Sequence, residues 1–274
     1  MKAMVLAAGL GTRLRPLTDD RPKALVTVAG RTLLEIAIER LRGFGVSEVI
    51  VNAHHHAEMI VAYLAEHENF GMRVEVSREE TLLDTGGGIR KAAPFFLEGE
   101  EAGAESGAGE PFFVHNVDVI STIDLARMAA AHRASGALVT LAVAAREASR
   151  QLLFDEAGRL CGRRTGGAEE RVRGGVEPLA SEYQALAFAG IHVVSPRIFG
   201  QMREAGAFSI VDAYLRLAGE GERVMAFRAD GAYWRDLGRP ESLAAAEREL
   251  REPAVVQNQL DATAPNDTSA TPME

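Results

Sequence analysis

Segments with strand character alternate with segments of helical character along the first half of this chain, and this alternation limits the possible folds more than any other feature. Short apolar runs are each followed by a stretch whose apolar residues recur at helical spacing. Strands are expected at 2–7, 48–52, 72–76 and 111–117, and helices at 32–44, 57–68, just before 94, and 121–135. Strands separated by helices pair in parallel, so the sequence predicts an α/β fold with a doubly wound, mostly parallel sheet covered by helices on both faces.

The second half has fewer helical signals. Strands are expected at 138–144, 151–154, 185–194 and 223–227, and Pro240 suits the first turn of a last helix. Thr32 with Glu35, and Ser121 with Asp124, have the spacing of a capping box at the start of a helix. We expect one domain over residues 1–252, an acidic flexible loop at 98–110 and a disordered tail at 253–274.

Charge and composition exclude several classes of protein. The chain has 39 acidic and 30 basic residues and a formal net charge of -9, which argues against a partner that is a nucleic acid. No apolar run approaches the length that crosses a bilayer, so no membrane partner is expected. The single cysteine, Cys161, fits a reducing compartment, and we expect a cytoplasmic protein.

The loop after the first strand is the most informative segment. Residues 6–18 read LAAGLGTRLRPLT, and residues 21–25 read RPKAL. Gly9 and Gly11 would let backbone N–H groups approach phosphate oxygens, Arg13 can hold a phosphate through two hydrogen bonds, and Lys23 supplies a compact charge. The spacing matches neither the dinucleotide fingerprint nor the Walker pattern. The residues therefore favour an anion-binding loop over a merely structural turn.

This segment resembles the N-terminal signature of the sugar-1-phosphate nucleotidyltransferase superfamily, L-A-A-G-x-G-T-R-L-x-P-L-T followed by P-K-x-L. The resemblance covers about residues 2–250 and implies a Rossmann-like, GT-A-like fold without a C-terminal β-helix. It implies catalytic roles for Arg13 and Lys23 at the reacting phosphates. The nucleotide contacts that it implies in this loop are Leu6, Ala7, Ala8, Gly9, Gly11, Thr12, Arg13 and Lys23.

Two aspartates match the positions that hold Mg²⁺ in this superfamily. Asp118 follows the strand 111–117, although Val117 stands where glycine is common. Asp236 lies in W-R-D-L-G-R-P-E, which resembles W-x-D-x-G-T-P-E with Arg239 in place of threonine. The resemblance thus implies Mg²⁺ as the cofactor, and two carboxylates with phosphate oxygens suit that ion.

The run LLDTGGGI at 82–89 resembles the segment by which the family contacts base and ribose, here through Thr85 and Gly86. This variant is similar to N-acetylmuramate-1-phosphate uridylyltransferases and to small mannose-1-phosphate guanylyltransferase-like enzymes. The run FAGIH at 188–192 resembles a strand that lines the sugar pocket. The resemblance implies that Asn116 and Gly190 contact the sugar.

The sequence therefore predicts an enzyme that condenses a nucleoside triphosphate with a sugar-1-phosphate to give a nucleotide sugar and pyrophosphate, with an N-acetylmuramate-1-phosphate uridylyltransferase as the narrower hypothesis. A mannose- or glucose-1-phosphate nucleotidyltransferase using GTP or dTTP stays open, as does a cytidylyltransferase acting on an alcohol phosphate such as phosphocholine. A catalytically silent regulatory subunit is a further alternative, against which the intact Arg13, Lys23, Asp118 and Asp236 argue. A dinucleotide-binding oxidoreductase would need a third glycine in the loop and an acid where Asn52 ends the second strand. The sequence leaves the nucleotide, the sugar and the oligomeric state open.

Overall fold

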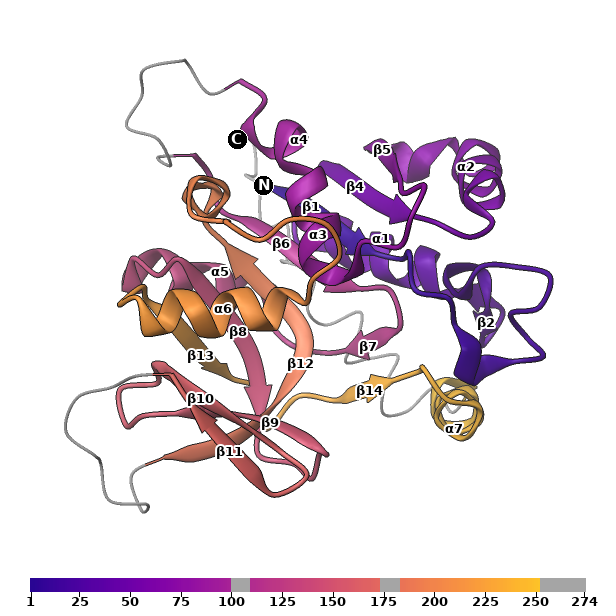
Figure 1. The fold of residues 1–274 in the computed structure, drawn as a ribbon. Coiled ribbons are helices and arrows are strands. Elements are labelled where there is room, and N and C mark those ends of the chain that lie inside the picture. Colours follow the sequence, from indigo (N-terminus) through magenta and orange to yellow (C-terminus); the bar gives the residue numbers. More distant parts are fainter. Residues whose placement is uncertain (100–108, 173–182, 252–274) are drawn as a thin grey trace, which may run out of the picture.

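Parallel strands form the first half of the central sheet in the computed structural model, which describes residues 1–99, 109–172 and 183–251. Their order is β6-β1-β4-β5, and every pair among them is parallel (Figure 1). They are β1 (Lys2–Leu6), β4 (Glu48–Ala53), β5 (Arg73–Arg78) and β6 (Phe112–Asn116). These strands confirm the parallel arrangement that the strand–helix alternation predicts.

The long strand β12 (Gln184–Val194) makes the sheet mixed. It runs antiparallel to β6 and to β8 (Val139–Ala144), whereas β13 (Val224–Arg228) pairs with β8 in parallel. Its pairing with β8 is irregular between Phe188 and His192, where Gly190 has a φ of 76°. The first part of β12 can therefore leave the main sheet and pair with β9.

Three antiparallel strands continue the sheet beyond β12, and we call them the roof sheet because they cover the cavity described below. They are β9 (Arg150–Phe154), β10 (Leu160–Thr165) and β11 (Ala168–Arg171). The sequence predicts β9 but misses β10 and β11. All four residues of β11 are exposed, so no buried face imposes an apolar alternation on it.

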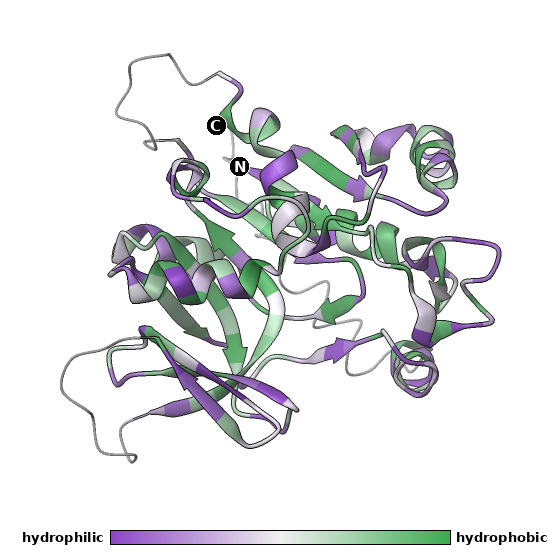
Figure 2. Ribbon diagram, in the orientation of Figure 1, coloured by the Kyte–Doolittle hydropathy of each residue, from purple (hydrophilic) through white to green (hydrophobic). Residues whose placement is uncertain are grey.

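Helices cover both faces of the sheet. Along β1, Ala3 and Val5 pack into one hydrophobic core and Met4 into the other. The first core is covered by α1 (Leu33–Gly43), α2 (Ala57–Glu66), α5 (Leu125–Ser135) and α7 (Pro240–Arg251); the second is covered by α3 (Asp84–Lys91), α4 (Ala93–Leu97) and α6 (Ile210–Gly219). The strands between these layers are mostly hydrophobic (Figure 2). This arrangement confirms the doubly wound fold class.

Short elements connect these layers. They are the 3₁₀ turns η1 (Thr12–Leu14), η2 (Lys23–Leu25), η3 (Glu68–Gly71) and η4 (Pro196–Gly200), the hairpin of β2 (Thr27–Val28) with β3 (Arg31–Thr32), and the pair β7 (Val119–Ser121) with β14 (Trp234–Asp236). No helix in the described ranges is long and apolar enough to cross a bilayer. The expected tail at 253–274 and most of the expected loop at 98–110 fall outside the described residues.

The helix cap expected at Thr32 is present, and the one expected at Ser121 is wrong. The Thr32 side chain accepts a hydrogen bond from the amide of Glu35 at 3.1 Å, so it caps α1 as expected. Ser121 instead lies buried in β7, and α5 begins later, at Leu125. The cap of α5 is Asp124, whose side chain accepts from the amide of Arg127 at 2.9 Å.

The glycine run also differs from its expected place before a helix. Gly86, Gly87 and Gly88 lie inside α3. A Cβ on Gly86 would come within 2.2 Å of the Phe208 ring, and one on Gly87 within 2.4 Å of the carbonyl oxygen of Gly206. Glycine is required here because the segment before α6 packs directly on the α3 backbone, and this contact outweighs the low helix propensity of glycine.

Buried histidines make the stability of the fold sensitive to acid. Burial lowers the pKa of His192 to about 3 and the pKa of His132 to about 4, whereas the pKa of a histidine in an unfolded chain is about 6.5. At a pH between the folded and the unfolded pKa of a histidine, the unfolded state therefore binds more protons than the folded state. As the pH is lowered through that range, the free energy of unfolding falls by about 1.4 kcal/mol per pH unit for each histidine. His192→Gln should remove the contribution of one histidine from the pH dependence of the free energy of unfolding, which is measured by urea unfolding at a series of pH values. The same change at the exposed His67 serves as the control, and an unchanged slope in His192→Gln would contradict the assignment.

Candidate active site

The loop after β1 has the form of an anion-binding cradle. The amides of Ala8, Gly9 and Leu10 have no hydrogen-bond acceptor within the described ranges. Gly11 adopts a φ of 64°, and a Cβ there would lie 3.0 Å from the Thr18 side chain, whose hydroxyl donates to the Gly11 carbonyl at 2.9 Å. Free amides held in a closed turn can donate to phosphate oxygens.

Leu6 and Ala7, also predicted as nucleotide contacts, use part of their backbone inside the fold. The Leu6 carbonyl accepts from the amide of Val117 at 3.1 Å, and the Ala7 amide donates to the Asn52 side chain at 2.7 Å. Asn52 in turn donates to the buried carboxylate of Glu79, which also accepts from the amide of Leu83. This chain of hydrogen bonds connects the cradle to the segment before α3.

The two cations that the sequence singles out lie beside the cradle. Arg13 is exposed on η1, and no hydrogen bond or ion pair holds its guanidinium within the part of the chain that the structure describes. Lys23 is half-buried on η2 and forms an ion pair with Asp118. Arg13 is thus free to bind an anion. Lys23 would have to leave Asp118, or contact both groups, when an anion binds.

Asp118 and Asp236 meet at Gly238. Antiparallel pairing of β14 with β7 places Asp236 opposite Val119, and the amide of Leu237 donates to the Asp118 carbonyl at 2.8 Å. A Cβ built on Gly238 would lie 2.8 Å from Asp236 Oδ1, 3.3 Å from Asp118 Oδ2 and 2.8 Å from Arg13 Nη2. Residues more than 100 positions apart in the sequence are therefore brought to one point.

The donor set at this point suits Mg²⁺. Two carboxylates converge there, and no group of three or more His, Cys, Asp or Glu side chains able to hold a metal occurs among the described residues. Protein sites for Mg²⁺ commonly supply one or two carboxylates and leave the other positions to water and substrate phosphates. Asp118 and Asp236 fit that pattern, with the free amides and Arg13 beside them for the phosphates.

Gly238→Ala should lower kcat/KM by roughly tenfold or more without unfolding the protein, because the new methyl group would displace Arg13 or the carboxylates. The backbone at Gly238 does not have a positive φ, so alanine is not strained there. Gly231→Ala is the matched control, since a Cβ at Gly231 meets nothing within 4 Å. Steady-state rates and thermal unfolding of both variants test this, and wild-type activity in Gly238→Ala would contradict it.

Thr85 and Gly86, the predicted base and ribose contacts, lie in the first turn of α3. The Thr85 hydroxyl oxygen accepts from the amide of Ile210 at 3.0 Å, and the Gly86 amide donates to the Phe208 carbonyl at 2.8 Å. These two groups are engaged in holding α3 against α6. A nucleotide contact at either residue would have to use its other atoms.

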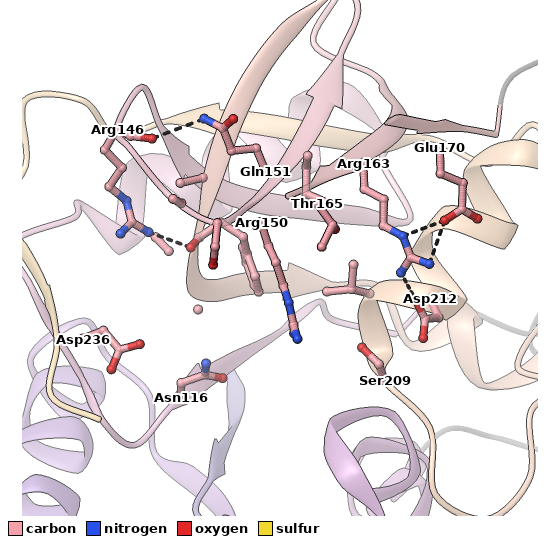
Figure 3. Close-up of a pocket in the computed structure, with 18 of the residues that line it drawn as sticks. Asn116, Arg146, Arg150, Gln151, Arg163, Thr165, Glu170, Ser209, Asp212 and Asp236 are labelled. Carbon is pink, nitrogen blue, oxygen red and sulfur yellow. Dashed lines mark hydrogen bonds and ion pairs between the residues drawn. The ribbon is translucent and has the colours of Figure 1, made fainter. Parts of the chain in front are cut away.

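A cavity of about 790 Å³ lies between the roof sheet and the carboxyl end of β6. Asn116, Gly190 and Asp236 line it together, so the predicted sugar contacts share one space with one of the predicted metal ligands (Figure 3). A Cβ on Gly190 would lie 2.8 Å from the Asn116 side chain, and the φ of 76° also requires glycine there. The cavity is large enough for a phosphorylated sugar.

Several cavity residues have no counterpart among the predicted contacts. Arg146 donates to the Phe188 carbonyl at 2.7 Å and stacks over the Trp234 ring at 3.3 Å, and Trp234 donates to the Ala189 carbonyl at 2.7 Å. Burial lowers the pKa of Arg146, and the nearby Asp236 opposes that change. The position of Arg146 just after an apolar strand was the one available sequence signal. Nothing in the pattern of Arg150, Gln151 or Asp212 indicated that these residues line a cavity.

Comparison with known protein families gives one match over almost the whole described chain. The model of the family described as nucleotidyl transferase matches residues 2–252. The chain is 36% identical to an N-acetylmuramate alpha-1-phosphate uridylyltransferase of Caulobacter vibrioides, over 91% of this chain and 97% of that protein. It is 29% identical to a probable mannose-1-phosphate guanylyltransferase of Oryza sativa, over 88% of this chain and 62% of that protein.

Solved structures share the fold at lower sequence identity. HddC from Yersinia pseudotuberculosis, complexed with GMP-PN, superposes with a TM-score of 0.70 at 20% identity, over 91% of this chain and 99% of that one. A UDP-glucose pyrophosphorylase complexed with UDP-glucose has a TM-score of 0.70 at 17% identity, over 91% and 98% of the two chains. At these identities the likeness establishes the fold alone.

Proposed function

The chain belongs to the nucleotidyl transferase family, and from this membership we propose that it transfers a nucleoside monophosphate to a sugar-1-phosphate and releases pyrophosphate. The observation that carries the proposal is the convergence of Arg13, Asp118 and Asp236 around Gly238, with Lys23 paired to Asp118. Two carboxylates and two cations at the open end of a phosphate-binding loop suit a reaction between phosphates. No protein nucleophile is needed for that chemistry.

In the proposed reaction an oxygen of the sugar phosphate attacks the α-phosphorus of the nucleoside triphosphate. The new P–O bond forms as the bond between the α-phosphorus and the bridging oxygen to the β-phosphorus breaks. Arg13 and the free amides of the cradle would stabilise the charge on the leaving pyrophosphate, and Lys23 would contact the phosphates near the reacting centre. Asp118 and Asp236 would hold Mg²⁺, which, when bound, supplies neutralisation of phosphate charge.

We propose UTP and N-acetylmuramate 1-phosphate as the substrates. The Caulobacter relative carries that activity in its name and matches this chain nearly end to end, whereas the mannose-1-phosphate relative is the longer protein. Mannose- or glucose-1-phosphate with GTP or dTTP is the second candidate, because a mannose-1-phosphate guanylyltransferase also occurs among the similar proteins.

A screen of pyrophosphate release tests the proposal. Purified protein with Mg²⁺ is assayed against each common nucleoside triphosphate in combination with N-acetylmuramate, N-acetylglucosamine, glucose and mannose 1-phosphates and with phosphocholine. The expected result is the highest kcat/KM with UTP and N-acetylmuramate 1-phosphate. A preference for GTP with mannose 1-phosphate would reject the proposed substrates but keep the reaction, and no release with any sugar phosphate would reject the reaction itself.

A further inference from the structure

Three arginines line the cavity, and two of them are already engaged. Arg146 is held by the Phe188 carbonyl and the Trp234 ring. Arg163 pairs with Glu170 at 2.7 Å and with Asp212 at 2.5 Å. The guanidinium of Arg150 has no hydrogen bond or ion pair within residues 1–99, 109–172 and 183–251. Figure 3 shows its side chain reaching down from the roof sheet into the cavity, toward the wall that carries Asn116.

The acidic groups on the roof side do not neutralise Arg150. Glu170 and Asp212 are the partners of Arg163, and Glu169 pairs with Arg164 at 2.6 Å. Every acidic side chain that lines this side of the cavity is therefore already paired with an arginine other than Arg150. The positive charge of Arg150 is thus left without a carboxylate partner among the described residues, and its side chain is directed into the space.

The reacting phosphates do not account for this charge. They belong at the opposite wall, where Asp236 lines the cavity and where Arg13 and Lys23 provide the cations. A sugar attached to such a phosphate would extend across the cavity toward β9. In that arrangement Arg150 would face the sugar ring and its substituents.

We propose that Arg150 binds a carboxylate carried by the sugar ring, and that it selects N-acetylmuramate 1-phosphate over N-acetylglucosamine 1-phosphate. The two sugars differ only in the lactyl ether of the muramate, which ends in a carboxylate. A guanidinium binds a carboxylate through two parallel hydrogen bonds, which gives both affinity and orientation. This inference rests on the proposed function, because it names the substrate feature that the same site would recognise.

The test compares both sugar phosphates, with UTP, on the wild type and on Arg150→Gln. We expect kcat/KM for N-acetylmuramate 1-phosphate to fall roughly 10- to 100-fold in the variant, and kcat/KM for N-acetylglucosamine 1-phosphate to change by less than about threefold. Arg150→Lys keeps the charge but not the two parallel hydrogen bonds, so its kcat/KM for N-acetylmuramate 1-phosphate should lie between those of the wild type and Arg150→Gln. Binding of the products, measured without turnover, should show the same selectivity. In Arg150→Gln the dissociation constant of UDP-N-acetylmuramate should rise, and that of UDP-N-acetylglucosamine should stay nearly unchanged.

Arg223→Gln is the matched control. Arg223 is exposed, lies just before β13 at the opposite end of the sheet, and does not line the cavity. Equal losses of kcat/KM for both sugars in Arg150→Gln would overturn the proposal in favour of a phosphate contact, and wild-type kcat/KM for both sugars would overturn it outright. If the wild type turned over N-acetylglucosamine 1-phosphate but not N-acetylmuramate 1-phosphate, the proposal would also be overturned, while the reaction class would stay intact. Failure of the wild type on both sugars would be a failure of the proposed substrates, visible before any variant is made.

Discussion

Replacing Asp118 with asparagine is expected to lower kcat/KM for pyrophosphate release by on the order of 10³-fold while leaving the fold intact. Asparagine keeps the shape of the side chain but removes one of the two negative charges beside Gly238. Lys23 also loses its ion-pair partner, so the balance between cations and carboxylates changes at the point where phosphates would bind. Steady-state rates over a series of Mg²⁺ concentrations, together with thermal unfolding, measure both parts of the expectation.

Asp236→Asn should behave in the same way, because Asp236 Oδ1 and Asp118 Oδ2 face the same point. In both variants the Mg²⁺ concentration for half-maximal rate should rise. Asp155→Asn is the control, since Asp155 pairs with Arg159 in the turn between β9 and β10 and does not line the cavity. Near-normal turnover by either active-site variant would reject the assignment of these aspartates as metal ligands.

The meeting of these two aspartates could be predicted from family resemblance but not from local pattern. The pairing that joins them is between β7 and β14, strands of only three residues each. Such short strands carry no detectable alternation of apolar residues. The capping-box spacing at Ser121 even predicted a helix that starts at the last residue of β7, and long-range pairing with β14 outweighed that local signal.

The middle strands of the central sheet were predictable because they are buried on both faces. Burial forces continuous apolar runs such as those of β1 and β6, and the helices between them have one apolar side. The roof sheet lacks this constraint. Its β10 carries Arg163 and Arg164, whose partners lie on β11 or on α6, so ion pairs replace the apolar pattern that identifies a strand.

The cavity is the part of the candidate site that sequence reasoning described least. Asn116 and Gly190 followed from resemblance, but Arg146 and Arg150 depend on how the roof sheet is placed over β6. That placement follows from the bend in β12 near Gly190, a tertiary feature. The residues that meet at Gly238 could thus be predicted from the resemblance, whereas the roof-side wall of the cavity needed the structure.

Arg13→Ala is expected to lower kcat by roughly 10²-fold or more, since removing one donor that stabilises developing charge has costs of that size in other enzymes. Arg13 has no partner among the described residues, and its Nη2 lies 2.8 Å from the Cβ position of Gly238, beside both aspartates. A guanidinium held there without a counter-ion of its own is available to the phosphates. Because it is exposed on η1, its removal should leave the unfolding temperature nearly unchanged.

The ranking of the variants separates a charge effect from a geometric one. Arg13→Lys retains the charge but not the paired hydrogen bonds, so it should recover part of the lost rate and no more. Arg223→Ala removes an exposed guanidinium that has no partner among the described residues and lies far from the loop, so this variant should keep the wild-type rate. If the rate of Arg13→Ala matched that of Arg223→Ala, the loop would bind the triphosphate through its amides alone. Full recovery in Arg13→Lys would instead show that a point charge is sufficient at this position.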